Sequence, residues 1–340
     1  MQEEPALRGF AVHWVAPGGV ILSRRDELFR ARGVGQAVER VGRAPAPLWR
    51  ALASRIRPLQ RLLRFMYYNV LELPDGRLFF TFDRTVGVQE GGVFRALPGL
   101  VRPTRVMHGG VALDERGDVY FGEYVGNKTR EEVHVYRLPA GGDRLEVIHT
   151  FRPGSARHVH GVYHDPFSRY LWCVTGDLPQ ECRVLRTADG FRTLETVGGG
   201  DESWRTVSLV FTERSVHYGS DGEFMRNYLY RIDRATGARH RLDELDGPVY
   251  FAQSTGEDLF FGVVAELCPS QSGRSGAIWH VRDGGPGECI AAREKDALPV
   301  ALFQPGTWQF SRGPGLPGSL FVHVVGLRAA DNRTFWLKTL

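Results

Sequence analysis

A short phrase recurs along the sequence and constrains the fold more than any other feature. Each copy has a turn with Gly, Asp or Ser, an alternating apolar run, and a second apolar run that ends in Tyr-Arg or a similar pair. Self-similarity of this kind indicates a repeat architecture. The copies cover residues 18–30, 75–95, 116–137, 168–186, 214–231, 257–280 and 318–337.

These repeats predict an all-β protein, and specifically a β-propeller. Each unit has an apolar strand before the turn and usually another after the second run, which gives four short strands about every 40 to 60 residues. We therefore expect one domain over residues 1–340 with seven four-stranded blades. Six blades is the alternative, because the unit at 18–30 is the least regular. The last unit supplies about three strands, so we expect the N-terminus to donate the missing one.

Residues 44–64 depart from the repeat and predict a short helical insertion. Its apolar residues fall on one helical stripe, its other face is basic, and Pro58 interrupts it. We expect the stripe to dock on the propeller; contact of the basic face with an anionic membrane surface is the alternative. The stripe comprises Leu48, Leu52, Ile56, Leu59 and Leu63, and the basic face comprises Arg50, Arg55, Arg57, Arg61 and Arg64.

The overall charge favours anionic ligands over nucleic acid. Lys and Arg exceed Asp and Glu by 43 to 39, and only three of the 43 basic residues are Lys. Arginine pairs bidentately with carboxylates, sulfates and phosphates. The arginines are scattered, however, and no recognition helix or basic run interleaved with aromatics is present, so no nucleic-acid partner is expected.

Several other classes find no support in the sequence. It has no G-x-S-x-G elbow, P-loop or G-x-G-x-x-G after a strand, so neither a nucleotide cofactor nor that type of acyl transfer is expected. The four Cys have no C-x-x-C spacing. No apolar run reaches about 20 residues, and the N-terminus is acidic, so we expect a cytoplasmic protein that does not span a membrane.

Polar residues cluster where a propeller brings strand ends together. The innermost strand of each blade lines the channel, and its start shares a face with the end of the second strand. Innermost strands are expected to begin near His108, His158, Arg205 and Gln304. Second strands are expected to end near Glu123, Asp177, Asp221 and Glu266, which would place carboxylates of four successive blades on the same rim as the histidines.

The sharpest local feature is the H-x-H of His158 and His160. Because a strand has a period of two, both imidazoles project to one side. With His108 and Gln304 they could hold one divalent ion such as Mn, Zn or Ca. The alternative is that the histidines pair with Glu123 or Asp177 and serve only to satisfy a polar channel.

Two kinds of chemistry fit this rim. Glu123 with Asp177 or Asp221 could act as acid and base on a glycosidic bond. Alternatively, His158 or His160 could abstract a proton beside a uronate carboxylate, which Arg205 or a metal ion would neutralise.

Four further residues are candidates for substrate binding. Arg205 precedes an apolar run and should emerge at the rim as a clamp for an anion. Tyr124, Tyr218 and Trp308 could stack on sugar rings, or they could pack between blades.

With these motifs the chain resembles the sialidase-like (BNR, or Asp-box) β-propeller superfamily. The Asp-box pattern Ser-x-Asp-x-Gly-x-Thr-Trp appears in eroded form at 187–194 and more faintly at 281–285. Residues 158–166, 175–177, 204–205 and 233–237 are similar to a group of uncharacterised bacterial propellers, a similarity that covers about residues 65–340. The resemblance implies the fold. No arginine triad or Tyr/Glu nucleophile pair aligns, so sialidase activity is not carried over.

The channel histidines are also similar in kind to those of metal-dependent oligouronide lyases, which are propellers too. The function predicted is therefore a carbohydrate-active propeller, with metal-assisted lyase or hydrolase action on a glycan or uronide. A propeller that binds a sugar or a protein partner without catalysis stays open, as does the oligomeric state.

Overall fold

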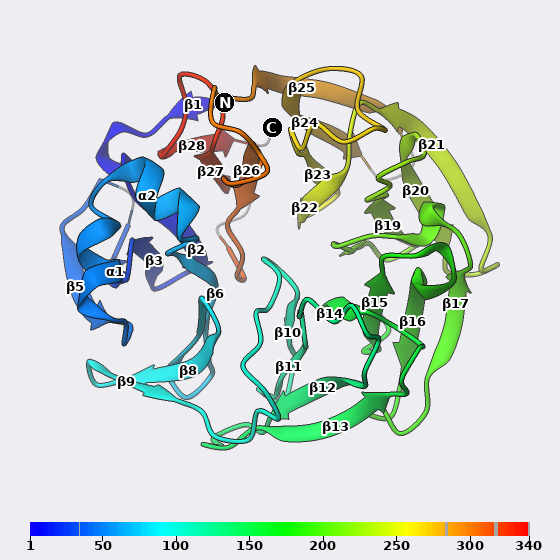
Figure 1. The fold of residues 1–340 in the computed structure, drawn as a ribbon, viewed down its shortest axis with the longest axis horizontal. Helices are drawn as coiled ribbons and strands as arrows, with labels where there is room; N and C mark the ends of the chain where they lie inside the picture. The colour runs from blue at the N-terminus through cyan, green and yellow to red at the C-terminus, as the bar shows by residue number, and fades with distance from the viewer. Residues whose placement is uncertain (34, 283–284, 316–318, 339–340) are drawn as a thin grey trace.

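Seven four-stranded antiparallel sheets form a ring around a central channel, so the protein is a seven-bladed β-propeller (Figure 1). The structure is a computed structural model that describes residues 1–33, 35–282, 285–315 and 319–338. The prediction of seven blades is confirmed, and the irregular first unit forms a complete blade. Asp283 and Gly284 of the fainter Asp-box pattern, and Gly318 of the last repeat, lie outside the described residues.

Each blade follows the chain from the channel to the rim. The first four blades are β2 (Ala11–Ala16), β3 (Gly19–Arg24), β4 (Glu27–Ala31), β5 (Val38–Arg43); β6 (Tyr67–Glu72), β7 (Leu78–Phe82), β8 (Thr85–Glu90), β9 (Val93–Ala96); β10 (Val111–Leu113), β11 (Val119–Gly122), β12 (Val133–Leu138), β13 (Glu146–Phe151); and β14 (His158–His164), β15 (Leu171–Gly176), β16 (Arg183–Thr187), β17 (Glu195–Gly199).

The next two blades follow the same order. They are β18 (Val210–Phe211), β19 (Ser215–Gly219), β20 (Asn227–Asp233), β21 (Arg239–Leu245); and β22 (Val249–Thr255), β23 (Asp258–Val263), β24 (Ser275–Arg282), β25 (Gly287–Glu294). Short 3-10 helices occur at η1 (Pro5–Leu7), η2 (Pro179–Glu181) and η3 (Glu202–Trp204).

The last blade combines strands from both ends of the chain, as predicted. It consists of β26 (Thr307–Phe310), β27 (Ser319–Val325), β28 (Arg333–Lys338) and, outermost, β1 (Gln2–Glu3). Gln2 pairs with Trp336 and Glu3 with Phe335. This pairing covers the edge of β28 and closes the ring.

The core lies between neighbouring blades, because both faces of each inner strand are covered. All five residues of β7 are buried, for example. Tyr218 stacks between Trp204 and Tyr230, and Trp308 is fully buried among residues of the last two blades. Large aromatic side chains thus fill the wedges between blades.

Residues 44–64 form two short helices, α1 (Leu48–Ala53) and α2 (Arg57–Leu62); the break lies before Pro58, which is in the first turn of α2. The prediction that their apolar stripe docks on the propeller is wrong for four of its five residues, since only Leu63 packs against the core. Arg61 is buried and pairs with Asp296, while Leu48 is 71% exposed and Ile56 58% exposed. Ion pairs between arginines of the helices and aspartates of the propeller fix the helices with the other apolar side chains of the stripe in solvent. Among the described residues, no helix is both long enough and apolar enough to cross a membrane.

Candidate functional site

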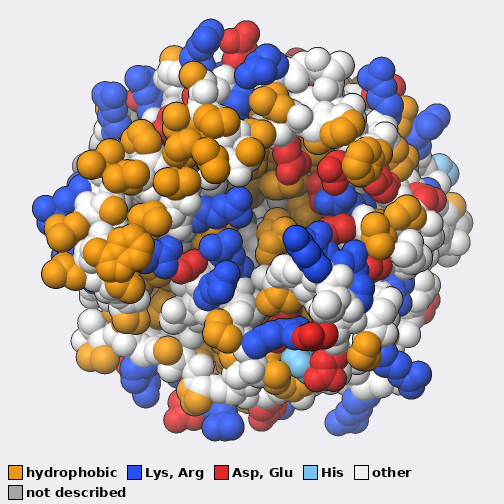
Figure 2. Space-filling view, in the orientation of Figure 1, with side chains coloured by type: hydrophobic (Ala, Val, Ile, Leu, Met, Phe, Trp, Pro, Cys, Tyr) orange, Lys and Arg blue, Asp and Glu red, His pale blue; other side chains and the backbone are white. Residues whose placement is uncertain are grey.

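The connections from the outermost strand of one blade to the innermost strand of the next lie on one face of the ring, which we call the connection face. Because strands alternate in direction, the ends of second strands lie there too. His158 begins β14 at this face, and Asp177 directly follows β15. Figure 2 shows this face hollowed at its centre, with acidic and basic side chains around the hollow.

Two imidazoles and one carboxylate converge at the channel mouth. The Nε2 atoms of His158 and His160 lie 3.1 Å apart, and each lies 3.3 Å from Asp177 Oδ1. Both histidines are buried. Of the described residues, these three form the one group of His, Cys, Asp and Glu side chains that is placed to hold a metal ion.

Local backbone features make this convergence possible. The ladder between β14 and β15 shifts register between Val159 and Gly161, so a bulge at His160 aims its ring back toward His158. Gly176, the partner of His158 in this ladder, leaves room for the ring of His160: a Cβ at this position would lie 2.6 Å from His160 Cε1. A side chain on residue 176 would therefore displace the imidazole.

Hydrogen bonds to the backbone fix which nitrogen of each imidazole carries a proton. His158 Nδ1 lies 3.0 Å from the carbonyl oxygen of Val125, and His160 Nδ1 lies 2.9 Å from that of Thr206. A carbonyl oxygen only accepts, so both Nδ1 atoms donate. In the neutral form both Nε2 atoms then present lone pairs to each other and to Asp177. Three lone pairs in contact require a cation between them, either a proton or a metal ion.

The geometry fits a metal ion. Donors bound to one ion at about 2.0 to 2.2 Å lie roughly 2.8 to 3.6 Å apart in tetrahedral or octahedral sites, which includes the observed spacings. Metal-bound histidines characteristically donate the other ring N–H to a carbonyl or carboxylate, as both do here. Burial lowers the pKa of His160 below its ordinary value, which opposes a proton at this point.

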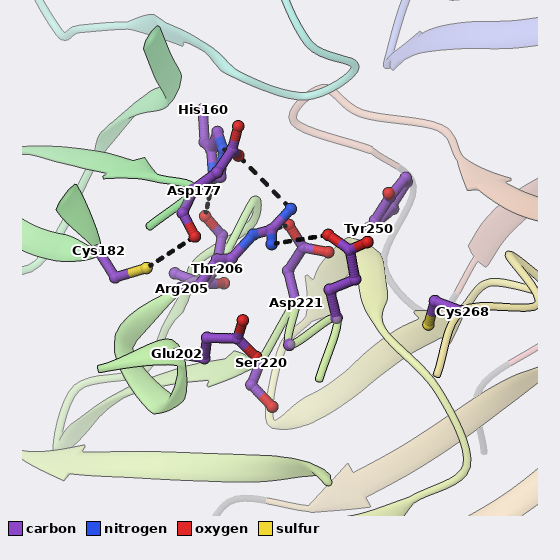
Figure 3. Close-up of polar contacts among 12 residues, drawn as sticks. His160, Asp177, Cys182, Glu202, Arg205, Thr206, Ser220, Asp221, Tyr250 and Cys268 are labelled. Atoms are coloured by element: carbon purple, nitrogen blue, oxygen red, sulfur yellow. Dashed lines mark hydrogen bonds and ion pairs between the residues drawn. The ribbon is translucent and has the colours of Figure 1, made fainter. Parts of the chain in front are cut away.

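Two arginines hold Asp177 in place. Arg157 Nη1 donates to Asp177 Oδ2 at 2.6 Å, which leaves Oδ1 facing the histidines. Arg205 Nη2 lies 3.5 Å from Asp177 Oδ1, and Arg205 Nε donates to Asp221 Oδ2 at 3.1 Å (Figure 3). Burial raises the pKa of Asp177, but the neighbouring histidines lower it more, so this carboxyl titrates below its ordinary range.

The pKa of Asp221 shifts in the opposite direction to that of Asp177. Burial raises its pKa to about 8, although Arg205 opposes the rise. Glu266 adds to it, and burial raises the pKa of Glu266 as well, beside a hydrogen bond of 2.8 Å from Tyr250 Oη. Two neighbouring carboxyls with pKa values driven in opposite directions are the arrangement that acid–base catalysis uses.

The site carries more acid than base. Four carboxyls meet only two guanidinium groups, so with all of them ionised the formal charge is −2. A divalent cation or bound protons would balance that excess. The carboxyls are Asp177, Asp221, Glu223 and Glu266, and the guanidinium groups are Arg157 and Arg205.

An open pocket of about 550 Å³ leads to Asp177 and Arg205. Arg130 and Arg157 also line it, and Phe224, 71% exposed, stands at its edge. The pocket thus combines guanidinium groups with an exposed aromatic ring. Tyr124 lies beside the group, with its ring centroid 4.2 Å from that of His158, and burial raises its pKa to about 12.

The structure does not bring His108 or Gln304 to this group, which corrects the predicted set of metal ligands. His108 packs between Tyr68 and Phe251 in the channel. Gln304 Nε2 donates to Met66 Sδ. Of the four expected strand starts, His158 is the first residue of its strand, and β10, β18 and β26 begin three to five residues after His108, Arg205 and Gln304.

Three other candidates are buried away from the site. Glu123 pairs with Arg102 and accepts from Tyr136 Oη, so it supports its own blade. Tyr218 and Trp308 fill the wedges between blades, as described above, and have no face free for a sugar ring. The structure thus favours the packing alternative for both aromatics. The candidates that it does bring together are His158, His160, Asp177, Asp221, Arg205 and Tyr124, whose roles stay predictions.

Sequence reasoning placed Glu266 at the rim without giving it a role, and it missed Arg157, Glu223 and Tyr250. A signal existed for two of them. Arg157 directly precedes the H-x-H, and Tyr250 lies at the start of an innermost strand, β22, as His158 does in β14. Glu223 lies beyond the end of β19, where sequence does not show which way a side chain turns.

Comparisons with known proteins establish the fold and leave the family open. No protein-family model matches the chain, and no curated protein matches its sequence. A catalytically inactive virginiamycin B lyase from Staphylococcus aureus, solved with quinupristin, has a TM-score of 0.61 at 10% identity, over 100% of this chain and 98% of that chain. An oligogalacturonate lyase in complex with manganese has a TM-score of 0.61 at 9% identity, over 100% and 95%.

A puromycin-hydrolysing peptidase of Mycobacterium tuberculosis gives a TM-score of 0.55 at 16% identity, over 99% of this chain and 54% of that chain. At such identities the likeness shows a β-propeller and no particular activity. It does not single out the sialidase-like superfamily.

Asp189 of the eroded Asp-box does form a turn, in which it accepts from Thr187 Oγ1 and Thr193 Oγ1. The fold and the site therefore define a seven-bladed propeller with a His/His/Asp group at its channel mouth.

Proposed function

We propose that this protein is a metal-dependent enzyme that cleaves an anionic glycan, with a uronide as the first substrate class to test. One observation carries the proposal: the two Nε2 lone pairs and Asp177 Oδ1 meet at 3.1 to 3.3 Å, while both Nδ1–H groups are tied to backbone carbonyls. His158, His160 and Asp177 would hold one divalent ion, with Mn and Zn the first candidates.

The pocket supports an anionic substrate. Arg130, Arg157 and Arg205 line it, and guanidinium groups bind carboxylates in a planar, bidentate manner. The exposed ring of Phe224 offers an apolar face for a sugar. The oligogalacturonate lyase in complex with manganese shares the fold at 9% identity, which makes oligogalacturonides a reasonable first choice.

Asp221 supplies the proton in this proposal. A carboxyl whose pKa is raised to about 8 is mostly protonated at neutral pH, so it can donate to the oxygen of the leaving sugar. Arg205, which contacts both Asp221 and Asp177, would orient that carboxyl and bind the substrate's anionic group. A bound divalent ion supplies Lewis acidity and lowers the pKa of water.

The geometry favours hydrolysis over elimination. Elimination requires a free base next to the acidic C–H of the uronate, but both imidazoles are committed as ligands through Nε2 and as donors through Nδ1. In hydrolysis, the bond between the anomeric carbon and the leaving oxygen breaks: the hydroxyl of water goes to the anomeric carbon, and the leaving oxygen takes the proton of Asp221. The remaining proton of the water then returns the Asp221 carboxylate to its protonated form.

The test is turnover of a panel of uronides and neutral glycans by protein loaded with Mn or Zn. New reducing ends report any cleavage, and ultraviolet absorbance of an unsaturated product reports elimination. We expect cleavage without the unsaturated product, and a loss of kcat of about 10²- to 10⁴-fold in Asp221→Asn with little change in KM.

Two outcomes would overturn this proposal. Tight binding of a glycan without turnover, unaffected by chelation, would establish the non-catalytic binding propeller. Turnover that yields the unsaturated product would replace hydrolysis with elimination and would return the role of base to a histidine.

A further inference from the structure

The helical insertion presents a large apolar surface to solvent. Six apolar side chains of α1, α2 and the link between them are exposed, and Figure 2 shows hydrophobic side chains covering this part of the connection face. Monomeric soluble proteins rarely leave so many large apolar side chains together in water. The six are Leu48, Trp49, Leu52, Ile56, Leu59 and Leu62, and we call them the helical patch.

Ion pairs with the propeller hold this patch outward. Arg50 Nη1 pairs with Asp83 at 2.5 Å, and Arg57 makes two bonds of 2.8 and 2.9 Å to Asp331. Arg61 is 1% exposed and pairs with Asp296. The arginines on the inner side thus anchor the helices, so the outward apolar surface is a fixed feature of the fold.

The charged residues of the insertion itself have one sign. From Arg40 to Leu71 the chain has seven Arg and no Asp or Glu. Three of the arginines pair with the propeller, as above, but Arg55 and Arg64 are exposed on the insertion and pair with no acidic side chain among the described residues. An apolar surface with Trp, flanked by unpaired arginines, is the chemistry of a segment that lies in the interface of an anionic membrane.

The rest of the connection face extends this surface. Exposed apolar side chains also occur in its connections and turns, at positions spread around the channel mouth. They are Val101, Leu178, Phe224 and Leu302. The patch is therefore part of a broader face that could rest on a flat lipid layer.

We propose that the helical patch binds anionic lipid bilayers, with its apolar side chains in the interface and Arg55 and Arg64 against the headgroups. This binding would turn the channel mouth toward the lipid. It is independent of the catalytic proposal, because no residue of the patch touches the His/His/Asp group.

The experiment is flotation of the full-length protein with vesicles of phosphatidylcholine, alone or mixed with anionic phosphatidylglycerol. We expect binding to the anionic vesicles and much weaker binding to the neutral ones. The double variant Trp49→Ser, Leu52→Ser should lose at least about tenfold in binding. Arg55→Gln should weaken binding several-fold, and salt should weaken it further.

A matched control is Phe167→Ser, which removes an apolar side chain of 52% exposure from the turn between β14 and β15 on the opposite face. It should bind vesicles as the wild type does. All variants change exposed side chains, and an unchanged melting temperature will verify their folding.

Failure of the wild type to float with either kind of vesicle would overturn the proposal. So would equal binding by the Trp49→Ser, Leu52→Ser variant, or equal binding to neutral and anionic vesicles. Concentration-dependent dimerisation that the double variant abolishes, without vesicle binding, would assign the patch to a second copy of the chain instead.

Discussion

The buried carboxyl of Asp221 makes the stability of the metal-free protein depend on pH in a specific direction. Its pKa is raised by burial from 3.8 to about 8. Between these values the unfolded chain has lost the proton that the native protein keeps, so a rise in pH favours the unfolded state. Stability from this group is complete below pH 3.8 and is lost as pH rises through 8.

The size of the effect follows from the two pKa values. One pH unit between them is worth about 1.4 kcal/mol. From pH 6 to pH 8 the free energy of unfolding should therefore fall by about 2 kcal/mol through Asp221, slightly less than the full slope because the native group begins to ionise near pH 8. Asn has the same shape and no proton to lose, so Asp221→Asn should lack this decline.

The assay is urea unfolding at pH 6, 7 and 8 in EDTA, with wild type and Asp221→Asn side by side. We expect the stability of the variant relative to wild type to increase by about 2 kcal/mol across this range. Glu266→Gln is a second test: because Glu266 helps to raise the pKa of Asp221, removing its charge should also weaken the decline with pH. Parallel curves for wild type and Asp221→Asn would refute the reasoning.

Three further predictions test other contacts. Arg157→Gln removes the 2.6 Å bond to Asp177 and should weaken metal binding about tenfold, as measured by calorimetry. An unchanged affinity would show that Arg157 does not support the metal site. Deletion of residues 1–4 removes β1 and should lower the free energy of unfolding by about 2 kcal/mol and promote aggregation, whereas unchanged melting would place closure elsewhere. Arg61→Met leaves Asp296 without its guanidinium partner and should lower the free energy of unfolding in urea by about 3 kcal/mol. An unchanged free energy of unfolding would contradict this and would show that Lys295 alone satisfies Asp296.

The fold could be predicted because its signal repeats. Seven similar units each show strand periodicity and turn residues, so an irregular unit such as 18–30 is supported by its neighbours. Ring closure by the N-terminus also followed, because the last unit was one strand short. Periodicity predicted that residues 44–64 are helical, but not which side faces the protein.

That orientation depends on distant partners. An apolar stripe normally docks inward. Here three aspartates of the propeller pair with arginines of the helices, so the arginine side faces inward instead; the aspartates are Asp83, Asp296 and Asp331. These acids are far from the insertion in sequence, and nothing local indicates that they will meet it.

The site was predictable only in part for a similar reason. The strand period predicted that His158 and His160 lie on one side, and in the structure a bulge at His160 turns its ring toward His158. The strand-end rule placed Asp177 and Asp221 at the same rim. The rule failed for Glu123, whose side chain turns into its blade toward Arg102. Which way a residue turns just beyond a strand is decided by tertiary contacts, and a single sequence does not contain them.

The central claim is that His158, His160 and Asp177 hold a divalent metal ion. Elemental analysis of purified protein, before and after incubation with Mn or Zn, tests it most directly, with His158→Ala and His160→Ala beside the wild type. We predict about one equivalent of metal per chain in the wild type and none in either variant. A wild type that stays free of metal after incubation, or variants that retain it, would contradict the account and would assign the cation between the histidines to a proton.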